Sequence, residues 1–523
     1  MREGDWETIP SLLRARAATG GEFLVVGDRR VSFAELDDLA ARVAGGLAAR
    51  GIHPGDRVAV CAPNGLEWLA LFFGAARLGA AVVTLNPRYR ERELDYMIAH
   101  SGARLVLSVA RTAEWDFASY FESSRSRLPD LEEVVYTGEG APPGCARFDD
   151  LAGDAARPDV APGPGTAAMI LYTSGTTGRP KGAVLTHRSM LASAAAQASH
   201  LGWDRSTASV MAMPLNHVGG ITCGILSSLV SGGRVVLLPG FSPAAVLAEA
   251  TRHRVGVLAG VPTMWVMMLA RLHQDPKSYD LSSVRVAVVG GSILDPTLAA
   301  QVAEALPAAV LVNLYGLSES SGASVLSAPG DDLATVTRSI GVVIDGFEAR
   351  VVGADGRQLP PGVPGELQLR GDCVAAGYWN LPEETAAAFL PDGWLATGDV
   401  AEVEPDGHLI LHGRTKEMYI SGGFNVYPAE VEAVLGAHPS VALAAGFGIG
   451  DSVYGEVGCY AVVPRAGAEP SPADLIAWCA GRLADYKVPR TIIVVDDVPL
   501  TPAGKVAKAE LRARLGYSRG ESS

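Results

Sequence analysis

The stretch from Tyr172 to Gly182, YTSGTTGRPKG, combines hydroxyl, glycine and basic residues in a pattern suited to holding an anion. Its glycines allow positive φ angles and close backbone approach. Backbone N–H groups of such a loop can form a concave nest for phosphate oxygens, and Lys181 adds a mobile positive charge. The common P-loop pattern GxxxxGK[ST] is not met, because no Ser or Thr follows the lysine. The stretch therefore indicates a phosphate-binding loop of another type.

Periodic patterns on both sides of this loop predict the elements that position it. An apolar strand is predicted over 167–173 and a helix over 187–200, and a helix start beside the loop would add N–H groups for phosphate. Upstream, helical and strand patterns alternate, as in a helix over 31–51 with a capping box from Ser32 to Glu35. This alternation predicts an α/β fold with a largely parallel sheet covered by helices.

The pattern changes along the second half of the chain. From about Ile340 short strands alternate with turn signals such as ADGR and PDGH, which indicates a β-rich subdomain. The last hundred residues, from about Gly413, have the pattern of a compact α+β unit. We therefore predict a large N-terminal domain over 1–412, made of layered α/β subdomains plus the β-rich subdomain, and a small C-terminal domain over 413–523.

Composition limits the partners. The net charge of −14 argues against nucleic acid or an anionic membrane surface as a general partner. No apolar run reaches the roughly 18 residues needed to span a bilayer, and the first residues lack the apolar segment of a secretory signal. We expect a cytoplasmic protein without a membrane span.

Four further stretches give the loop its context: NLYGLSES (313–320), WLATGD (394–399), GRTKEMYISGGFNVYPAEVE (413–432) and PLTPAGKVAKAEL (499–511). With the loop, and in this order, they make nearly the whole chain resemble the adenylate-forming superfamily of acyl-CoA synthetases, luciferases and peptide-synthetase adenylation domains. The resemblance implies that ATP activates a carboxylic acid as an acyl-adenylate with release of pyrophosphate. Transfer to coenzyme A then gives an acyl-CoA thioester and AMP. It also implies Mg²⁺ as a cofactor and a mobile C-terminal domain.

The resemblance assigns nucleotide roles to individual residues. Asn313 would hydrogen-bond the adenine amino group, and Tyr315 would stack on the ring. Asp399 would bind both ribose hydroxyls, with Arg414 nearby. The residues implied for ATP and AMP are Thr173, Ser174, Gly175, Thr176, Thr177, Lys181, Gly291, Ser292, Asn313, Tyr315, Gly316, Asp399 and Arg414. Mg²⁺, which prefers carboxylate and phosphate oxygens, would be held by Glu319 with Thr176.

The resemblance also places the reacting and moving parts. Lys505, one of six lysines in the chain, would steady the charge that develops when a carboxylate attacks the α-phosphate. The residues implied for catalysis are Lys505, Ser318, Glu319 and His217, with Ser318 standing where the family more often has Thr. Lys416 has the hinge position, and Gly422, Gly423 and Asn425 belong to the loop that guides the thiol of coenzyme A.

The acid itself is less clearly indicated. The segment MPLNHVGGITCGIL (213–226) matches the family's acyl pocket, with His217 at its gate position. No Asp lies between Met213 and Ile225, which disfavours an amino-acid substrate. The implied pocket residues are His217, Val218, Gly219, Val261, Met264, Gly290 and Ser321. They indicate a short, mainly apolar pocket, and our hypothesis is a medium-chain or aromatic acid.

Several alternatives stay open at this point. A stand-alone adenylating enzyme would pass its intermediate to a carrier protein or to a non-thiol acceptor, including an amine, or would activate nitrite for aryl-amine diazotisation. A luciferase-like oxygenase would need an oxidisable acyl-adenylate. A non-catalytic nucleotide-binding relative would be expected to have lost the residues of the reactive positions. These residues are all present: Glu319, Asp399, Arg414 and Lys505. The chain is expected to be a monomer or a homodimer.

Overall fold

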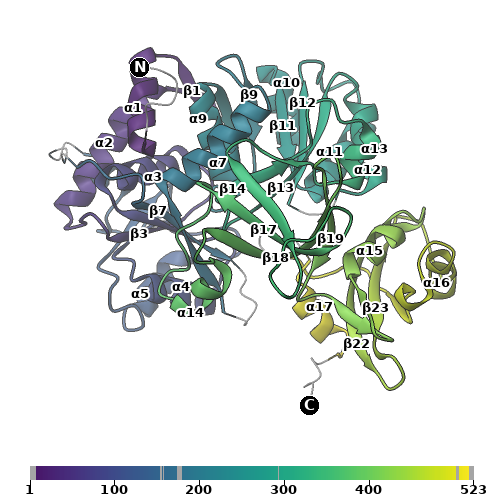
Figure 1. Cartoon of the computed structure of the whole chain (residues 1–523). Helices are drawn as coiled ribbons and strands as arrows, with labels where there is room; N and C mark the ends of the chain where they lie inside the picture. Colours follow the sequence, from purple (N-terminus) through teal and green to yellow (C-terminus); the bar gives the residue numbers. More distant parts are fainter. Residues whose placement is uncertain are drawn as a thin grey trace.

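The fold was analysed in a computed structural model, which describes residues 7–153, 156, 158, 160–173, 179–291, 294–501 and 506–517. Two helix-covered sheets form most of a large body (Figure 1). A third sheet packs on this body, and a smaller unit that carries the C-terminus lies at the lower right of the view. This arrangement confirms the predicted fold class.

The first sheet contains the strand that leads into the phosphate loop. Its six described strands follow the order β6–β5–β3–β4–β7–β8 and are parallel except for the β7–β8 pair. They are β3 (Arg57–Cys61), β4 (Ala81–Thr84), β5 (Leu105–Val109), β6 (Glu133–Thr137), β7 (Ala167–Thr173) and β8 (Lys181–Thr186). The accompanying helices are α1 (Ile9–Thr19), α2 (Phe33–Ala49), α3 (Leu66–Leu78), α4 (Glu91–Ser101), α5 (Phe117–Ser124) and α6 (Phe148–Leu151). Helices α4 and α5 cover one face, while α2 and α3 cover the other.

The glycine-rich loop joins the two strands of a β-hairpin, so the predicted strand–loop–helix order is wrong. Thr173 at the end of β7 pairs with Lys181 at the start of β8. Residues 181–186 pair with β7 in antiparallel register, and helix α7 (His187–His200) begins only afterwards. Thr186 caps that helix by accepting the Ser189 N–H at 3.0 Å. The start of α7 is therefore one strand away from the loop.

The second sheet has nine strands in the described chain, in the order β15–β14–β13–β12–β11–β9–β10–β1–β2. They are β1 (Glu22–Val26), β2 (Arg29–Ser32), β9 (Ala208–Met211), β10 (Arg234–Leu237), β11 (Val257–Gly260), β12 (Val286–Gly290), β13 (Val310–Leu317), β14 (Gly322–Leu326) and β15 (Val342–Val343). The six strands from β13 to β1 are parallel. Helices α10 (Pro243–His253), α11 (Pro262–Gln274) and α12 (Pro296–Ala305) cover one face, and α7 lies on the other, between the sheets. Short helical pieces connect these elements: α8 (Val218–Gly220), the π-helix η1 (Ile221–Leu226), α9 (Ser227–Ser231) and α13 (Leu333–Arg338).

The third sheet is antiparallel, as the turn signals predict. Its described strands are β16 (Phe347–Val352), β17 (Gly365–Gly371), β18 (Trp394–Val403) and β19 (Leu409–Arg414), accompanied by α14 (Pro382–Ala388). The PDGH turn joins β18 to β19. The buried face of this sheet packs against β13 and β14 of the second sheet through Tyr315 and Val325.

The C-terminal unit is built on its own sheet, in the order β21–β20–β23–β22 with β24 beside β23. Its elements are β20 (Tyr419–Ser421), β21 (Phe424–Val426), α15 (Pro428–Gly436), β22 (Val441–Asp451), β23 (Gly455–Pro464), α16 (Pro472–Ala480), the 3-10 helix η2 (Asp485–Lys487), β24 (Thr491–Val494) and α17 (Lys508–Arg514). Two apolar clusters, one on each face of this sheet, form its core. The start of α15 packs against the end of β19, where a Cβ on Gly413 would lie 3.4 Å from Cβ of Tyr427.

Candidate nucleotide and acid site

The residues expected around the acid and the adenine lie at the carboxyl ends of neighbouring parallel strands. His217 follows β9, Val261 follows β11, Gly290 ends β12, and Tyr315 lies near the end of β13. A Cβ on Gly291, whose φ is +88°, would lie 3.3 Å from Cγ1 of Val261, so the segments after β11 and β12 are in contact. In open α/β sheets this carboxyl edge is the usual place for a ligand.

His217 is held by the short helix that it begins. Its Nδ1 accepts the N–H of Gly219 at 3.1 Å, and the chain then enters the π-helix η1. Single π-turns occur preferentially at functional sites. A Cβ on Gly219 would lie 2.6 Å from Cε of Met213, so a larger residue there would require the end of the Met213 side chain to move. The gate role of His217 stays a prediction.

The other expected pocket residues are mostly buried. Val218 and Met264 belong to the apolar core beneath this edge. Ser321 is fully buried, has a φ of +58°, and its hydroxyl has no hydrogen-bond partner among the described residues. A buried hydroxyl without a partner is costly, and the pocket role of Ser321 stays a prediction.

Asp399 is the most tightly held carboxylate of the site. It is 2% exposed, and its Oδ2 accepts the phenol hydroxyl of Tyr315 at 2.6 Å. Nε of Arg414, its partner across the β18–β19 ladder, donates to Oδ1 at 2.9 Å. Burial, with the charge of Asp399 adding to it, raises the pKa of Tyr315 well above its usual value, so the phenol stays protonated and donates. Tyr315, which is expected to stack on adenine, thus also orients Asp399, the carboxylate expected to hold the ribose.

Three hydrogen bonds hold Asn313 in place. Its Nδ2 donates to the carbonyls of Ser339 at 3.0 Å and Val336 at 3.3 Å, and its own backbone N–H donates to Oγ of Ser327 at 2.9 Å. Because both amide hydrogens are used, the atom left to interact with a ligand is the acceptor Oδ1. That atom is the correct partner for an exocyclic amino group of adenine. Gly316 follows in the same strand, where a Cβ would lie 2.0 Å from the carbonyl oxygen of Gly322.

Glu319 is oriented by Tyr378, a residue that the sequence reasoning missed. The Tyr378 hydroxyl donates to Oε1 of Glu319 at 2.8 Å, and the Glu319 carbonyl accepts the N–H of Ala375 at 2.9 Å. Burial, and then the charge of Glu319, raise the pKa of Tyr378. Ser318, beside it, is nearly buried. Tyr378 belongs to no motif of the five used above, and only its neighbours in space reveal it.

The segment around Tyr378 also connects this carboxylate to the phosphate-loop hairpin. Residues 376–379 run along β8: the N–H of Trp379 donates to the carbonyl of Gly182 at 2.8 Å, and that of Val184 to Gly377 at 2.9 Å. Nζ of Lys181 lies 5.2 Å from the centre of the Tyr378 ring, within cation–π range. One side chain therefore contacts both the lysine expected on the phosphates and the carboxylate expected on Mg²⁺.

The residues around Glu319 fit a magnesium site. Its Oε2 makes no hydrogen bond to any described residue, so a hard anionic oxygen is available beside Lys181 and Tyr378. Mg²⁺ is typically bound by one or two carboxylates together with substrate phosphates, which suits a single glutamate. A second group of metal-ligand type, Glu404, Asp406 and His408, lies at the β18–β19 turn. Its His408 contacts Asp331 at 3.1 Å, so we assign no metal to that turn.

The remaining expected residues fall into two groups. Lys416 is exposed just beyond β19. Gly422 and Gly423, with φ of +58° and +86°, form the exposed two-residue turn between β20 and β21. Asn425 lies in β21. Positive φ at both positions explains the glycine pair. The residues that lie outside the described part of the chain are Ser174, Gly175, Thr176, Thr177, Ser292 and Lys505.

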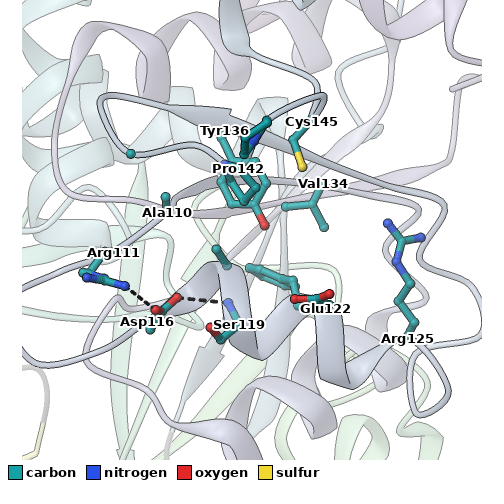
Figure 2. Close-up of a pocket in the computed structure, with 14 residues that line it drawn as sticks. Ala110, Arg111, Asp116, Ser119, Glu122, Arg125, Val134, Tyr136, Pro142 and Cys145 are labelled. Carbon is teal, nitrogen blue, oxygen red and sulfur yellow. Dashed lines mark hydrogen bonds and ion pairs between the residues drawn. The ribbon is translucent and has the colours of Figure 1, made fainter.

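A cavity of about 730 Å³ lies elsewhere, between α5, β6 and the loop that follows β6 (Figure 2). At its rim Asp116 accepts the Ser119 N–H at 3.0 Å and pairs with Arg111 at 2.6 Å. None of the residues that line it belongs to the expected site.

Over the described ranges, no helix combines the length and the apolar character that crossing a membrane would require.

Comparison with known proteins adds independent evidence. The family model described as AMP-binding enzyme matches residues 13–379, and the AMP-binding enzyme C-terminal domain matches 430–505. Feruloyl-CoA synthase of Amycolatopsis sp is 37% identical, covering 96% of this chain and 98% of its own. The "3-[(3aS,4S,7aS)-7a-methyl-1,5-dioxo-octahydro-1H-inden-4-yl]propanoyl:CoA ligase" of Mycobacterium tuberculosis is 36% identical, and the match covers 97% of this chain and 99% of the relative.

Among solved structures, the anthranilate CoA ligase AuaEII in complex with anthranoyl-AMP is similar over almost its full length. It covers 98% of this chain and 99% of its own at 28% sequence identity, with a TM-score of 0.88.

Proposed function

The chain belongs to the family of AMP-binding enzymes, the adenylate-forming superfamily, and from this premise we propose that it is an acid–thiol ligase that converts a ring-bearing carboxylic acid to its coenzyme A thioester. The observation that carries the proposal is the buried Asp399 carboxylate, held by Tyr315 and Arg414 beside the oriented amide of Asn313. This is a site for an adenosine at the edge where the acid pocket is expected.

Adenylation comes first. A carboxylate oxygen of the acid attacks the α-phosphorus of ATP, the bond from that phosphorus to the bridging oxygen breaks, and pyrophosphate leaves with the electron pair. Asn313 and Asp399 fix the adenosine, and Lys181 steadies the departing phosphates. Lys505 is assigned to the charge on the approaching carboxylate and α-phosphate. Glu319 and Thr176 would hold Mg²⁺, which when bound neutralises phosphate charge.

Thioester formation follows from the same intermediate. The sulfur of coenzyme A, having lost its proton, attacks the acyl carbon, the bond to the AMP oxygen breaks, and AMP leaves. We assign the exposed Gly422–Gly423 turn to guiding this thiol. The region 413–523 turns about Lys416 between the two steps, as multi-step enzymes commonly rearrange.

A ring-bearing acid is favoured over a straight medium-chain acid. The relatives of 36–37% identity are named for acids with a ring, feruloyl and an indene-derived propanoyl, as is the structurally similar anthranilate CoA ligase, whereas the relatives named medium-chain acyl-CoA ligases are 31–32% identical. The expected pocket is mainly apolar, as Val218, Val261 and Met264 indicate, which suits the carbon skeleton of such an acid. Cinnamates, benzoates and ring-substituted propanoates are therefore the first acids to test.

The test is a panel of acids assayed with ATP, Mg²⁺ and coenzyme A, in which pyrophosphate release, loss of free thiol and product mass are measured together. We expect hydroxycinnamates or benzoates to react faster than octanoate, with one thiol lost per AMP formed. Turnover of acetate or malonate alone would remove the proposed acid class. Pyrophosphate release without thiol loss would move the acceptor to a carrier protein, an amine or another non-thiol group.

A further inference from the structure

His408 lies in the turn between β18 and β19 and contacts a carboxylate that belongs to another sheet. Its Nε2 lies 3.1 Å from Oδ1 of Asp331, which follows β14, across a sequence separation of 77 residues. The two side chains are only 11% and 9% exposed. Because a carboxylate can only accept, Nε2 carries the proton and donates in this contact. Neither residue lies in the five motifs of the site, so the contact requires an explanation of its own.

The aspartate belongs to residues 327–339, here called the adenine segment, which contacts Asn313 near both of its ends. At the start of the segment, Oγ of Ser327 accepts the N–H of Asn313 at 2.9 Å, and the N–H of Ser327 donates to the carbonyl of Asn313 at 3.0 Å. At the other end, the carbonyls of Val336 and Ser339 accept hydrogen bonds from Nδ2. The direction in which Oδ1 of Asn313 points therefore depends on the shape of this segment.

Asp331 holds the turn between the two ends of the adenine segment. Its Oδ2 accepts the N–H of Ala328 at 2.7 Å, and its own N–H donates to the carbonyl of Ala328 at 3.1 Å. One carboxylate oxygen thus closes the turn, and the other accepts from His408. Removing the donor would leave a nearly buried carboxylate oxygen without this partner, which is unfavourable and loosens the turn.

Two further contacts join the β18–β19 turn to the same part of the chain. Glu404 pairs with Arg338 in α13, and their side chains are 24% and 45% exposed. The N–H of Ile340 donates to the carbonyl of Leu409 at 2.8 Å, and the N–H of Leu409 donates to the carbonyl of Gly341 at 2.8 Å. Partly exposed ion pairs contribute little. The more deeply buried imidazole is therefore the side chain of this turn that holds the adenine segment most firmly.

The surroundings of His408 favour its charged form. Burial lowers the pKa of the imidazole, but its contacts with the carboxylates of Asp406 and Asp331, and their charges, raise it above its usual value. The third carboxylate of this group, Glu404, is paired with Arg338. A hydrogen bond from a charged donor to a carboxylate is stronger than a neutral one. The contact with Asp331 is thus suited to holding a chain segment in place.

We propose that His408 is a positioning residue for base recognition, which holds Asp331 so that the adenine segment keeps Oδ1 of Asn313 directed at the amino group of adenine. The proposal rests on the proposed function, because it assumes that Asn313 contacts the base. His408 acts through Asp331 and is assigned no contact with the nucleotide. Its loss should weaken AMP binding and reduce the preference for AMP over inosine monophosphate, which has a carbonyl oxygen in place of the amino group.

The experiment measures the Kd of AMP and of inosine monophosphate by calorimetry in the full-length protein, without any acid. The native protein should prefer AMP by about 10-fold or more, because Oδ1 of Asn313 would face an oxygen in the analogue. His408→Phe fills the space without a donor. It should raise the Kd of AMP about 5-fold and that of the analogue less than about 2-fold, so the preference falls about 3-fold. His408→Gln keeps an N–H near Nε2 and should bind AMP within about 2-fold of native.

His253 provides a matched control. Its Nε2 lies 3.1 Å from Oε2 of Glu249, and its side chain is 6% exposed. It ends α10, and the chain then enters β11 at the amino end of that strand, whereas the site lies at the carboxyl ends. His253→Phe should leave both Kd values unchanged. A native preference in His408→Phe, or an equal loss of affinity for both nucleotides, would overturn the proposal.

Two further variants keep the outcomes separate. Asp331→Asn keeps an acceptor for only one of its two donors, so it should reduce the preference in the same direction, and it decides the matter in the same way if His408→Phe does not fold. Asn313→Ala tests the adenine assignment itself. A native preference in Asn313→Ala, or equal binding of both nucleotides by the native protein, would contradict that assignment and the proposal that depends on it.

Discussion

The hydroxyl of Tyr378 donates a 2.8 Å hydrogen bond to Oε1 of Glu319 across a sequence separation of 59 residues. The same aromatic ring lies 5.2 Å from the ammonium of Lys181. The residues expected to bind the outgoing phosphates and their metal are thus oriented by a third residue, which contacts both.

Tyr378→Phe should raise KM for MgATP about 10-fold, because a hydrogen bond to a charged group contributes about 1.5–3 kcal/mol. The Mg²⁺ concentration needed for half-maximal ATP binding, measured by calorimetry, should rise with it. Tyr120→Phe is the control, since Tyr120 donates a 2.8 Å hydrogen bond to Asp95 away from the site. An equal effect of both variants would refute the orienting role of Tyr378.

Tyr315→Phe should destabilise the protein by about 1–3 kcal/mol, because Oδ2 of the buried Asp399 loses its donor. Nucleotide binding should also weaken. Thermal unfolding with and without AMP measures both effects, since a ligand raises the unfolding temperature according to its affinity. If the shift caused by AMP is the same in the variant and the native protein, Asp399 does not depend on Tyr315 for its orientation.

His187 should make the protein sensitive to mild acid. Burial lowers the pKa of its imidazole to about 4, and its Nδ1 accepts the N–H of Ile9 at 3.4 Å. The unfolded chain binds this proton near pH 6.5, so the neutral imidazole contributes stability that is complete above pH 6.5 and lost as pH falls toward 4. The full contribution is about 3 kcal/mol.

His187→Asn keeps an acceptor near Nδ1 and removes the titration. Urea unfolding between pH 7 and pH 4.5 should show that the variant loses less stability than the native protein as pH falls. Parallel curves for the two proteins would show that His187 is not the group that responds.

Gly423→Ala should slow thioester formation about 5-fold and leave adenylation intact, because a left-handed conformation costs a non-glycine residue about 1–2 kcal/mol. The measurement is the rate of thiol loss with supplied acyl-adenylate. Gly407→Ala is matched to it: Gly407 has a φ of +92° and open space around it, in the β18–β19 turn. Equal slowing by both variants would mean that the effect is general strain.

Local signals in the sequence predicted most elements, because local chemistry decides them. The capping box at Ser32 begins α2 as expected, and the pattern over 187–200 gives the exact bounds of α7. The strand over 167–173 is β7. The order around the phosphate loop was wrong because β8 is defined by its partners, β7 on one side and residues 376–379 on the other. Six residues contain too little pattern to show that pairing.

The sequence motifs assign roles to single residues but do not show where one residue acts on another. Asn313 and Asp399 are found at positions that suit their expected contacts. Tyr378 was missed as a site residue because its partner, Glu319, is remote in sequence. The contact from Tyr315 to Asp399, two residues that were both expected, was also missed. Such relationships depend on how sheets pack together, and a single sequence does not show them.

The register of β18 and β19 places Arg414 opposite Asp399, two residues before Lys416. If Lys416 is the pivot, as proposed, the C-terminal unit turns beside the carboxylate that is expected to bind the ribose. A ribose that hydrogen-bonds to Asp399 would share this carboxylate with Arg414, the last residue of β19. Nucleotide binding and rotation of the C-terminal unit would then involve the same residue, Arg414.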